Sequence, residues 1–250
     1  MKTVNLEVCK NNTTILNNIN VKFQKHTLTS ILGPNGAGKT TFLKSLAGLE
    51  EKSLHTIELN GTSLKSLSLL ERSRKIAWVP TSLQIPFQYT VYELLLMARF
   101  PWHQGNPNDA DIQFVETIID QLNLGAIKFL PYNFLSTGQQ KLTLIARAFA
   151  QDTEFVILDE PSAHLDLSIS LKIMNLFKTF VKMGKTIIIS LHDISLAKKF
   201  SDHAIMLKEG KIVKSGNPSE IFIPEIFRGV FGVKINFYQY EGSESISIDL

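Results

Sequence analysis

The chain has 250 residues, of which 44% are hydrophobic, and its formal net charge is only +3. This length is enough for one sizeable α/β domain, and the modest charge argues against a nucleic-acid-binding surface. The single cysteine, Cys9, excludes an internal disulfide and a thiolate metal cluster. No apolar run approaches the roughly 18 residues of a membrane-spanning helix, and the N-terminus lacks the apolar run of a signal peptide. We therefore expect a protein that works in the cytosol.

Short apolar runs alternate along the chain with segments of helical periodicity. The run 27–33 predicts a buried strand, and the next segment predicts a helix with four apolar residues on one face: Phe42, Leu43, Leu46 and Leu49. Further strands are predicted just before Pro80 and at 154–160, 185–190 and 204–210, the last one turning at Glu209-Gly210 into a hairpin. Strands that alternate with helices indicate a parallel sheet covered by helices on its faces.

The middle of the chain, about 85–150, contains no convincing strand. Its periodicity predicts helices at 90–99, 109–122 and 136–150, joined by polar loops. We interpret it as a helical subdomain inserted in the α/β core. The resulting organisation is one domain over 1–217 and a C-terminal extension over 218–250, which is amphipathic at first and then polar.

A glycine-rich segment, "GPNGAGKT", follows the first core strand and opens a helix. It fits the pattern G-x-x-x-x-G-K-[ST], in which curled backbone N–H groups and a helix N-terminus surround phosphate groups. Lysine reaches the β- and γ-phosphates, and the hydroxyl that follows it ligates Mg²⁺. The predicted nucleotide-binding residues are Gly33, Pro34, Asn35, Gly36, Ala37, Gly38, Lys39, Thr40 and Thr41.

Two carboxylates end the apolar strand in "FVILDEP". Ligands of parallel sheets bind beyond the carboxyl ends of the strands, so Asp159 is predicted to hold Mg²⁺ and Glu160 to orient the attacking water. Alternatively, both acids are solvated and cap the next helix. His192 ends another apolar strand, in "IIISLHD", where it is placed to contact a γ-phosphate. Asp166, in the segment "SAHLD", is a further candidate nucleotide contact.

A second anion-binding turn is predicted at "LSTGQQ", because Ser136 and Gly138 stand at the start of a helix. One nucleotide site has no need of two phosphate-binding turns. Two chains packed head to tail do, since the turn of each chain would face the glycine-rich loop of the other.

The motifs "GPNGAGKT", "LSTGQQ", "VILDEP", "SAHLD" and "SLHD", in this order over residues 1–217, resemble the ATPase subunits of ABC transporters. The resemblance implies an α/β fold of the P-loop NTPase class, with a RecA-like core, an antiparallel β subdomain and a helical subdomain. It also implies ATP and Mg²⁺ as cofactors and a homodimer in which Ser136, Gly138 and Gln139 meet the partner's γ-phosphate. A separate membrane permease would be the other partner.

A narrower resemblance lies in "TVYELLLMARFPWHQ" and in the tail "GNPSEIF…EIFRGVFGVKI". Both are similar to importers of iron–siderophore, heme and cobalamin. This implies ATP-driven uptake at the cytoplasmic face of the inner membrane, through a permease served by a substrate-binding protein. The alternatives are an importer of another substrate and a soluble ABC ATPase acting on nucleic acid or ribosomes. The second is disfavoured by the single cassette and the low charge.

The sequence departs from the family pattern at three places. The glutamine expected right after the strand at Pro80 is replaced by Thr81, and the next glutamine is Gln84. We expect Thr81 to take the metal-contacting position, with weaker coupling between the nucleotide site and the membrane partner. Gln84 is the alternative. A third possibility is that neither residue contacts the metal. Thr137 replaces a glycine of the second turn, and we expect function to survive because a hydroxyl is tolerated at the start of a helix. Lys10 stands where an aromatic residue would stack on adenine, a contact worth roughly 1–3 kcal/mol.

Overall fold

The protein, described here as a computed structural model, is built around a six-stranded sheet; the structure describes residues 1–163, 165–240 and 243–249. The strand order is β10-β9-β3-β8-β7-β6, and all neighbours are parallel except β9 and β10. These strands, including the hairpin of β9 and β10, are those that the sequence predicted for the core. Their bounds are β3 (Leu28–Leu32), β6 (Ile76–Val79), β7 (Phe155–Leu158), β8 (Thr186–Ser190), β9 (His203–Lys208) and β10 (Lys211–Gly216).

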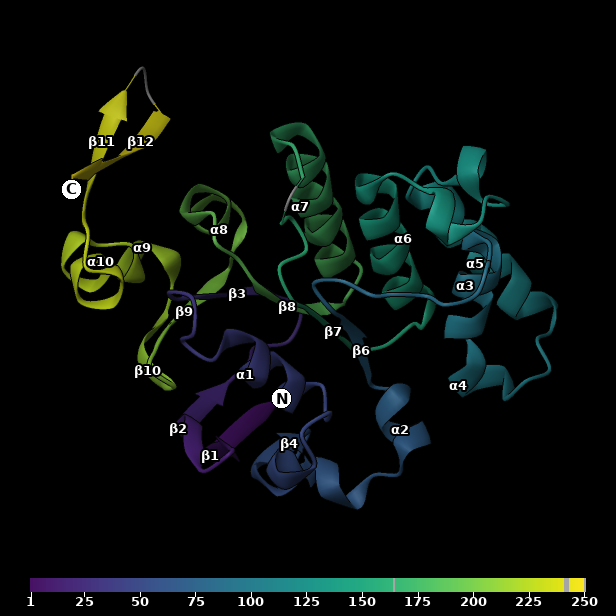
Figure 1. Ribbon diagram of the computed structural model, residues 1–250, viewed down its shortest axis with the longest axis horizontal. Coiled ribbons are helices and arrows are strands. Elements are labelled where there is room, and N and C mark those ends of the chain that lie inside the picture. The colour runs from purple at the N-terminus through teal and green to yellow at the C-terminus, as the bar shows by residue number, and fades with distance from the viewer. Residues whose placement is uncertain (164, 241–242, 250) are drawn as a thin grey trace.

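The central strands are apolar throughout because both faces of the sheet are covered. Every residue of β3, β7 and β8 is buried. Along β7, Val156 and Leu158 pack into the core on one face, whereas Phe155 and Ile157 pack into the core on the other, as the alternation of side chains along a strand requires. In Figure 1 the first face carries α6 (Thr137–Ala150), α7 (Leu167–Lys182) and α8 (Ile194–Phe200), and the second carries α1 (Lys39–Leu46).

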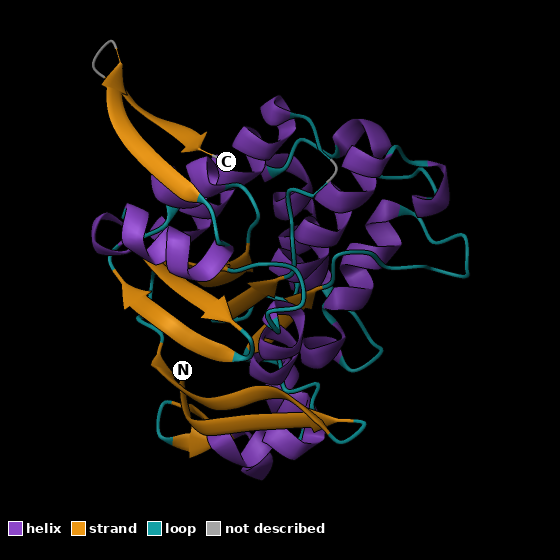
Figure 2. Ribbon diagram, turned by 60° about the vertical axis from the view of Figure 1, so that its left-hand side comes forward, coloured by secondary structure: helices purple, strands orange, loops and turns teal. Residues whose placement is uncertain are grey.

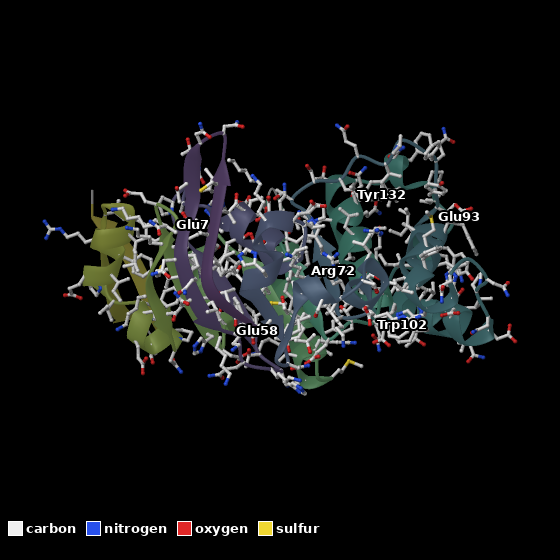
Figure 3. The ribbon with its side chains drawn as sticks, turned by 90° about the horizontal axis from the view of Figure 1, so that it is seen from below. Glu7, Glu58, Arg72, Glu93, Trp102 and Tyr132 are labelled. Carbon is white, nitrogen blue, oxygen red and sulfur yellow. The ribbon has the colours of Figure 1, made fainter. Side chains whose placement is uncertain are left out.

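A four-stranded antiparallel sheet, of order β2-β1-β4-β5, packs over α1 at one end of the molecule (Figure 2). Its strands are β1 (Lys2–Lys10), β2 (Thr13–Lys22), β4 (Ile57–Leu59) and β5 (Thr62–Ser63). The 3-10 turns η1 (Glu51–Thr56) and η2 (Leu64–Ser66) and the helix α2 (Leu69–Ser73) complete this part. Figure 3 shows Glu7 and Glu58 on this side and Arg72 toward the helical part of the chain.

The segment between β6 and β7 is helical, as predicted. It contains α3 (Val91–Ala98), α4 (Phe100–His103), α5 (Asp109–Gln121) and α6, with short turns η3 (Gly125–Ile127) and η4 (Tyr132–Phe134). Thr90, Asn108 and Ser136 cap α3, α5 and α6, each in a reciprocal arrangement with the residue three positions later. These capping boxes determine where the helices begin, and the boundaries predicted from periodicity agree with them to within one or two residues.

The prediction for Leu49 was wrong. The helix α1 ends at Leu46, and the side chain of Leu49 is 55% exposed, whereas Phe42, Leu43 and Leu46 are fully buried. The cause is Gly48, whose φ of +74° places it in the left-handed region that ends helices. The apolar periodicity continues beyond the point at which the backbone turns.

The C-terminal extension contains α9 (Pro218–Ile221) and α10 (Pro224–Phe231), which bury Ile221 and Phe227 beside the core sheet. A hairpin of β11 (Lys234–Tyr240) and β12 (Ser243–Asp249) follows and projects from the molecule in Figure 1. The sequence had indicated only an amphipathic tail that becomes polar. Within the described ranges, no helix combines the length and apolarity needed to span a bilayer.

Candidate functional site

The glycine-rich loop lies between β3 and α1 and curls as its sequence predicts. Gly36 and Gly38 have φ values of +78° and +101°, in the region that favours glycine. Gly33 is required for packing instead, because a Cβ atom there would lie 2.1 Å from the backbone oxygen of Leu207. Gly38 caps the N-terminus of α1. The loop therefore directs backbone N–H groups and a helix N-terminus toward one point, which suits a phosphate.

Lys39 lies in the bend of this loop. Its ammonium donates to the backbone oxygens of Gly33 at 2.8 Å and Pro34 at 3.1 Å, and the residue is only 6% exposed. Burial lowers the pKa of Lys39, and the nearby charges of Glu160 and Asp159 partly oppose that shift. Two loop carbonyls thus hold the cation where a phosphate would replace them as its partner.

Asp159 is the centre of a cluster of hydroxyl groups. It is 2% exposed and accepts hydrogen bonds from Thr40 Oγ1 at 2.8 Å, Thr81 Oγ1 at 3.1 Å and Ser190 Oγ at 2.7 Å. Oxygen atoms of carboxylates and hydroxyls are the ligands that Mg²⁺ prefers. The structure brings together all three residues predicted for the metal, and adds Ser190, whose signal was a serine at the end of the apolar run "TIIIS".

Glu160 and His192 form a contacting pair. His192 Nε2 lies 2.5 Å from Glu160 Oε1, and the Glu160 amide donates to Ser190 Oγ at 2.8 Å. The φ of Glu160 is +49°, an uncommon left-handed value for a residue other than glycine. Such backbone strain persists where surrounding contacts hold it and is frequent at functional sites. His192 therefore holds the carboxylate of Glu160, and Ser190 holds its backbone.

The second anion-binding turn lies at the N-terminus of α6. Ser136 Oγ accepts from the Gln139 amide at 3.3 Å, and Gln139 Oε1 accepts from the Ser136 amide at 2.9 Å. A Cβ atom on Gly138 would lie 3.2 Å from the tip of Ile169, so this glycine permits close packing on α7. Ser136 and Gln139 are exposed and make no bond to the glycine-rich loop among the described residues.

Asp166 caps α7. Its carboxylate accepts from the Ile169 amide at 2.8 Å and from the Ser168 hydroxyl at 2.8 Å, and the first of these bonds is the larger cause of its lowered pKa. The side chain is exposed. Within one chain, this predicted nucleotide contact therefore has a structural role.

The loop after β6 distinguishes the two candidates for the missing glutamine. Thr81 reaches Asp159, whereas Gln84 lines a separate hollow with Tyr132 and Asn133. The sequence did not single out Lys141, whose ammonium donates to the Thr81 backbone oxygen at 2.7 Å from α6. Lys10, expected near adenine, pairs with Glu50 at 2.5 Å.

The strand β3 ends in a glycine-rich loop, and β7, separated from it by β8 in the same parallel sheet, ends in paired carboxylates. This arrangement defines a P-loop nucleotide-binding ATPase. The model of the ABC transporter family matches residues 16–163, and the chain belongs to this family. The fold class, the resemblance and the ATPase activity predicted from the sequence are confirmed at this level, and ATP is the nucleotide that such a cassette binds.

Relatives resemble the chain over most of its length. It is 34% identical to the iron(3+)-hydroxamate import ATP-binding protein FhuC of Bacillus subtilis, over 88% of this chain and 82% of that protein. It is 28% identical to the hemin import ATP-binding protein HmuV of Rhodococcus jostii, over 90% and 77%. Among solved structures, cbiO1 from Clostridium perfringens, part of the ABC transporter complex cbiONQ, superposes with a TM-score of 0.75 at 26% identity, over 90% of this chain and 91% of that one.

Proposed function

We propose that this chain is the ATP-hydrolysing subunit of an importer that takes up a metal chelate: an iron–siderophore, heme or cobalamin. The observation that carries the ATPase part is the pair Asp159 and Glu160, fixed beside Lys39 and Thr40. The import part is supported by the relatives, which include proteins named for petrobactin and cobalamin import as well as the two above. An importer of another substrate is the alternative.

The residues present fit ATP with Mg²⁺. The loop amides and Lys39 would bind the β- and γ-phosphates, and Thr40, Asp159 and Thr81 offer the oxygen ligands for the metal. Bound Mg²⁺ would neutralise charge on the phosphates. Glu160 would accept a proton from the attacking water, and His192, held against it, would keep the carboxylate in place and contact the γ-phosphate.

The active unit we propose is a homodimer. Ser136 and Gln139 are exposed and make no hydrogen bond to the glycine-rich loop among the described residues, so a second copy would bring such a turn to the γ-phosphate. Dimeric structures exist for the cassette MJ0796, which is 26% identical to this chain over 87% of its length. ATP bound between two copies favours the closed state because it contacts both of them only there.

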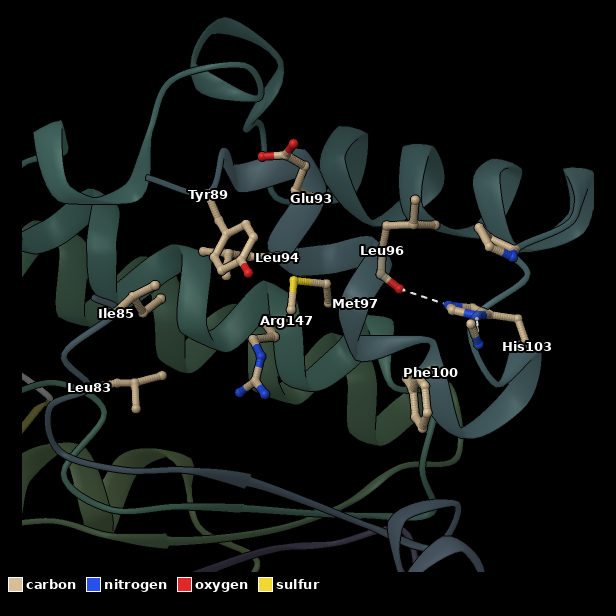
Figure 4. A pocket seen from close by; sticks show the side chains of 12 residues that line it. Leu83, Ile85, Tyr89, Glu93, Leu94, Leu96, Met97, Phe100, His103 and Arg147 are labelled. Carbon is tan, nitrogen blue, oxygen red and sulfur yellow. Dashed lines mark hydrogen bonds between the residues drawn. The ribbon is translucent and has the colours of Figure 1, made fainter. Parts of the chain in front are cut away.

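A separate permease would dock beside α3. A cavity of about 650 Å³ opens there, lined by Leu83 and Ile85 from the loop after β6 and by apolar residues of α3 and α4 (Figure 4). Figure 4 shows Met97 and Arg147 directed into the same space. Thr81, at the start of the lining loop, contacts Asp159. Movement of a docked permease would therefore shift the loop and change the contact between Thr81 and Asp159. This arrangement suits a subunit that lies at the cytoplasmic face of the membrane and serves a permease with its substrate-binding protein.

The test is a capture experiment with tagged Glu160→Gln protein and ATP, using native membranes solubilised in detergent. We expect a polytopic permease in the eluate by mass spectrometry. Lys39→Ala protein, which should bind ATP roughly 10- to 100-fold more weakly, is the matched control for nucleotide-dependent capture at a low ATP concentration. Ribosomal or other soluble partners in place of a permease would refute the import function. If a permease is found, its binding protein is then screened against iron–siderophores, heme and cobalamin.

A further inference from the structure

Lys141 is a buried lysine that the ATPase site described above does not use. It lies on α6, five positions after Ser136, and is only 6% exposed. Its ammonium makes one hydrogen bond, to the Thr81 backbone oxygen at 2.7 Å, and no carboxylate in the described part of the chain lies within ion-pair distance. Burying an ammonium with a single hydrogen-bond acceptor costs free energy of folding, which suggests that Lys141 has a role other than stabilising the fold.

Thr81 is held from two sides. Its backbone oxygen accepts from Lys141, and its hydroxyl donates to Asp159 Oδ2 at 3.1 Å, the same oxygen that accepts from Thr40. A continuous chain of contacts therefore runs from the helix that begins with the second anion-binding turn to the carboxylate proposed for Mg²⁺.

The side chain of threonine is short, so its hydroxyl reaches Asp159 only if the backbone of the loop is held close. A glutamine could reach the same carboxylate from a more distant backbone. The neighbouring loop residues, through Ile85, are otherwise tied to the helical part mainly by the Asn133 amide, which donates to the Ile85 oxygen at 3.1 Å. The hydrogen bond from Lys141 is the one made to Thr81 itself, the residue whose hydroxyl must reach Asp159.

We infer that Lys141 is a positioning residue: it holds the Thr81 backbone so that the Thr81 hydroxyl meets Asp159, and it links α6 to the metal-binding end of the ATP site. The inference rests on the proposed role of Thr81 at that site. Lys141 makes no hydrogen bond to either carboxylate, although its charge interacts with Asp159 and Glu160 through space. The Thr81→Val background isolates the part of its effect on hydrolysis that passes through Thr81.

The experiment combines a double-mutant cycle with hydrogen–deuterium exchange on the full chain. Lys141→Met removes the donor and keeps the apolar stem, Thr81→Val removes the hydroxyl, and the double variant completes the cycle. Lys128→Met, which removes a lysine paired with Glu116 at the surface of the same helical part, is the control. We expect Lys141→Met to lower kcat roughly tenfold, within the range seen for residues in contact, with KM for ATP unchanged because the glycine-rich loop is intact.

Two results decide the inference. In the Thr81→Val background, Lys141→Met should have almost no further effect on kcat, and in Lys141→Met alone the amides of residues 81–85 should exchange faster while the rest of α6 does not. The inference would be overturned if the two substitutions lowered kcat independently, so that the fold-changes multiply in the double variant. Faster exchange over all of α6 in Lys141→Met would also overturn it. If Thr81→Val leaves kcat unchanged, the proposed metal role of Thr81 fails, while the exchange measurement still tests whether Lys141 holds the loop.

Discussion

At the scale of single residues, the two carboxylates after β7 differ in their surroundings. Asp159 is buried among three hydroxyl donors, which suits a ligand of a metal ion. The side chain of Glu160 is 24% exposed and contacts His192, which leaves it accessible to a water molecule. Both residues follow the end of β7 at Leu158, and the backbone turns at Glu160, where φ is +49°, so the two adjacent side chains have different surroundings.

Replacing Glu160 by glutamine should abolish turnover and preserve ATP binding. The amide keeps the shape but cannot accept the proton, so we expect phosphate release to fall by about 10²- to 10⁴-fold. ATP affinity, measured separately by a fluorescent analogue, should stay the same. Glu154→Gln, which removes a surface carboxylate paired with Lys25 just before the same strand, is the control. Retained hydrolysis in the Glu160→Gln protein would show that Glu160 is not the group that accepts the proton of the attacking water.

Replacing Lys39 by alanine should act one step earlier, on binding. The ammonium already lies inside the loop, held by two carbonyls, so its loss removes a charged donor to the phosphates. Hydrogen bonds to charged groups are worth about 1.5–3 kcal/mol, which corresponds to a roughly 10- to 100-fold weaker affinity for ATP. Lys44→Ala in the last turn of the same helix is the control. Unchanged ATP affinity in Lys39→Ala protein would contradict the phosphate-binding role.

The sequence predicted the residues whose position follows from a local motif. Lys39, Thr40, Asp159 and Glu160 lie at strand ends or in a fixed turn, so the motif implies their place. Lys141 was missed because its role depends on a contact across 60 positions, which no local pattern records. For Asp166, the sequence placed the residue in a family motif but did not reveal that its own helix uses the carboxylate as a cap.

At the scale of elements, the core strands and the inserted helices were predictable because periodicity and caps agree. The N-terminal strands β1 and β2 alternate less clearly, since much of their surface is exposed. Their place in an antiparallel sheet was implied only by family resemblance. The C-terminal hairpin was not predicted at all: a run of serines and isoleucines after a glycine has no strong signal without a packing partner.

The cap of α3 gives a prediction at this scale. Thr90 Oγ1 accepts from the Glu93 amide at 3.2 Å, and Glu93 Oε2 accepts from the Thr90 amide at 2.8 Å. Thr90→Ala should lower the free energy of unfolding by about 1 kcal/mol, measured by urea denaturation at pH 7. Thr117→Ala on α5 is the control, because its hydroxyl is exposed and caps no helix. Equal stability of the two variants would contradict the assigned cap.

The same cap should depend on pH. The bonds from the Thr90 amide and hydroxyl lower the pKa of Glu93 below its ordinary 4.5. A carboxylate with a lowered folded pKa contributes stability above its unfolded pKa, and this contribution is lost as pH falls through the folded pKa. The stability difference between the wild type and Glu93→Gln should therefore be present at pH 7 and shrink as pH falls below about 4.5. A difference that grows in acid would contradict the sign.

At the scale of the whole molecule, the glycine-rich loop and the turn at Ser136 share no hydrogen bond among the described residues, which is why we propose that a second copy completes the ATP site. The glycine-rich loop, Asp159 and Glu160 lie at the ends of core strands, whereas the turn at Ser136 opens an exposed helix end. Association of two copies in a head-to-tail arrangement with twofold symmetry would complete two sites at once. The assembly should therefore depend on ATP, and blocking hydrolysis should make it long-lived.

Gly138→Asp in the Glu160→Gln background should prevent this ATP-dependent dimer. The new Cβ atom lies 3.2 Å from the flexible tip of Ile169, which can move, while the added carboxylate repels a partner's phosphates. Gly125→Asp is the matched control, because a Cβ atom at Gly125 meets no atom within 4 Å. By light scattering with ATP, the control should have twice the monomer mass and Gly138→Asp the monomer mass, although both bind ATP equally. A Gly138→Asp dimer would mean that the turn at Ser136 does not face the nucleotide of a second copy.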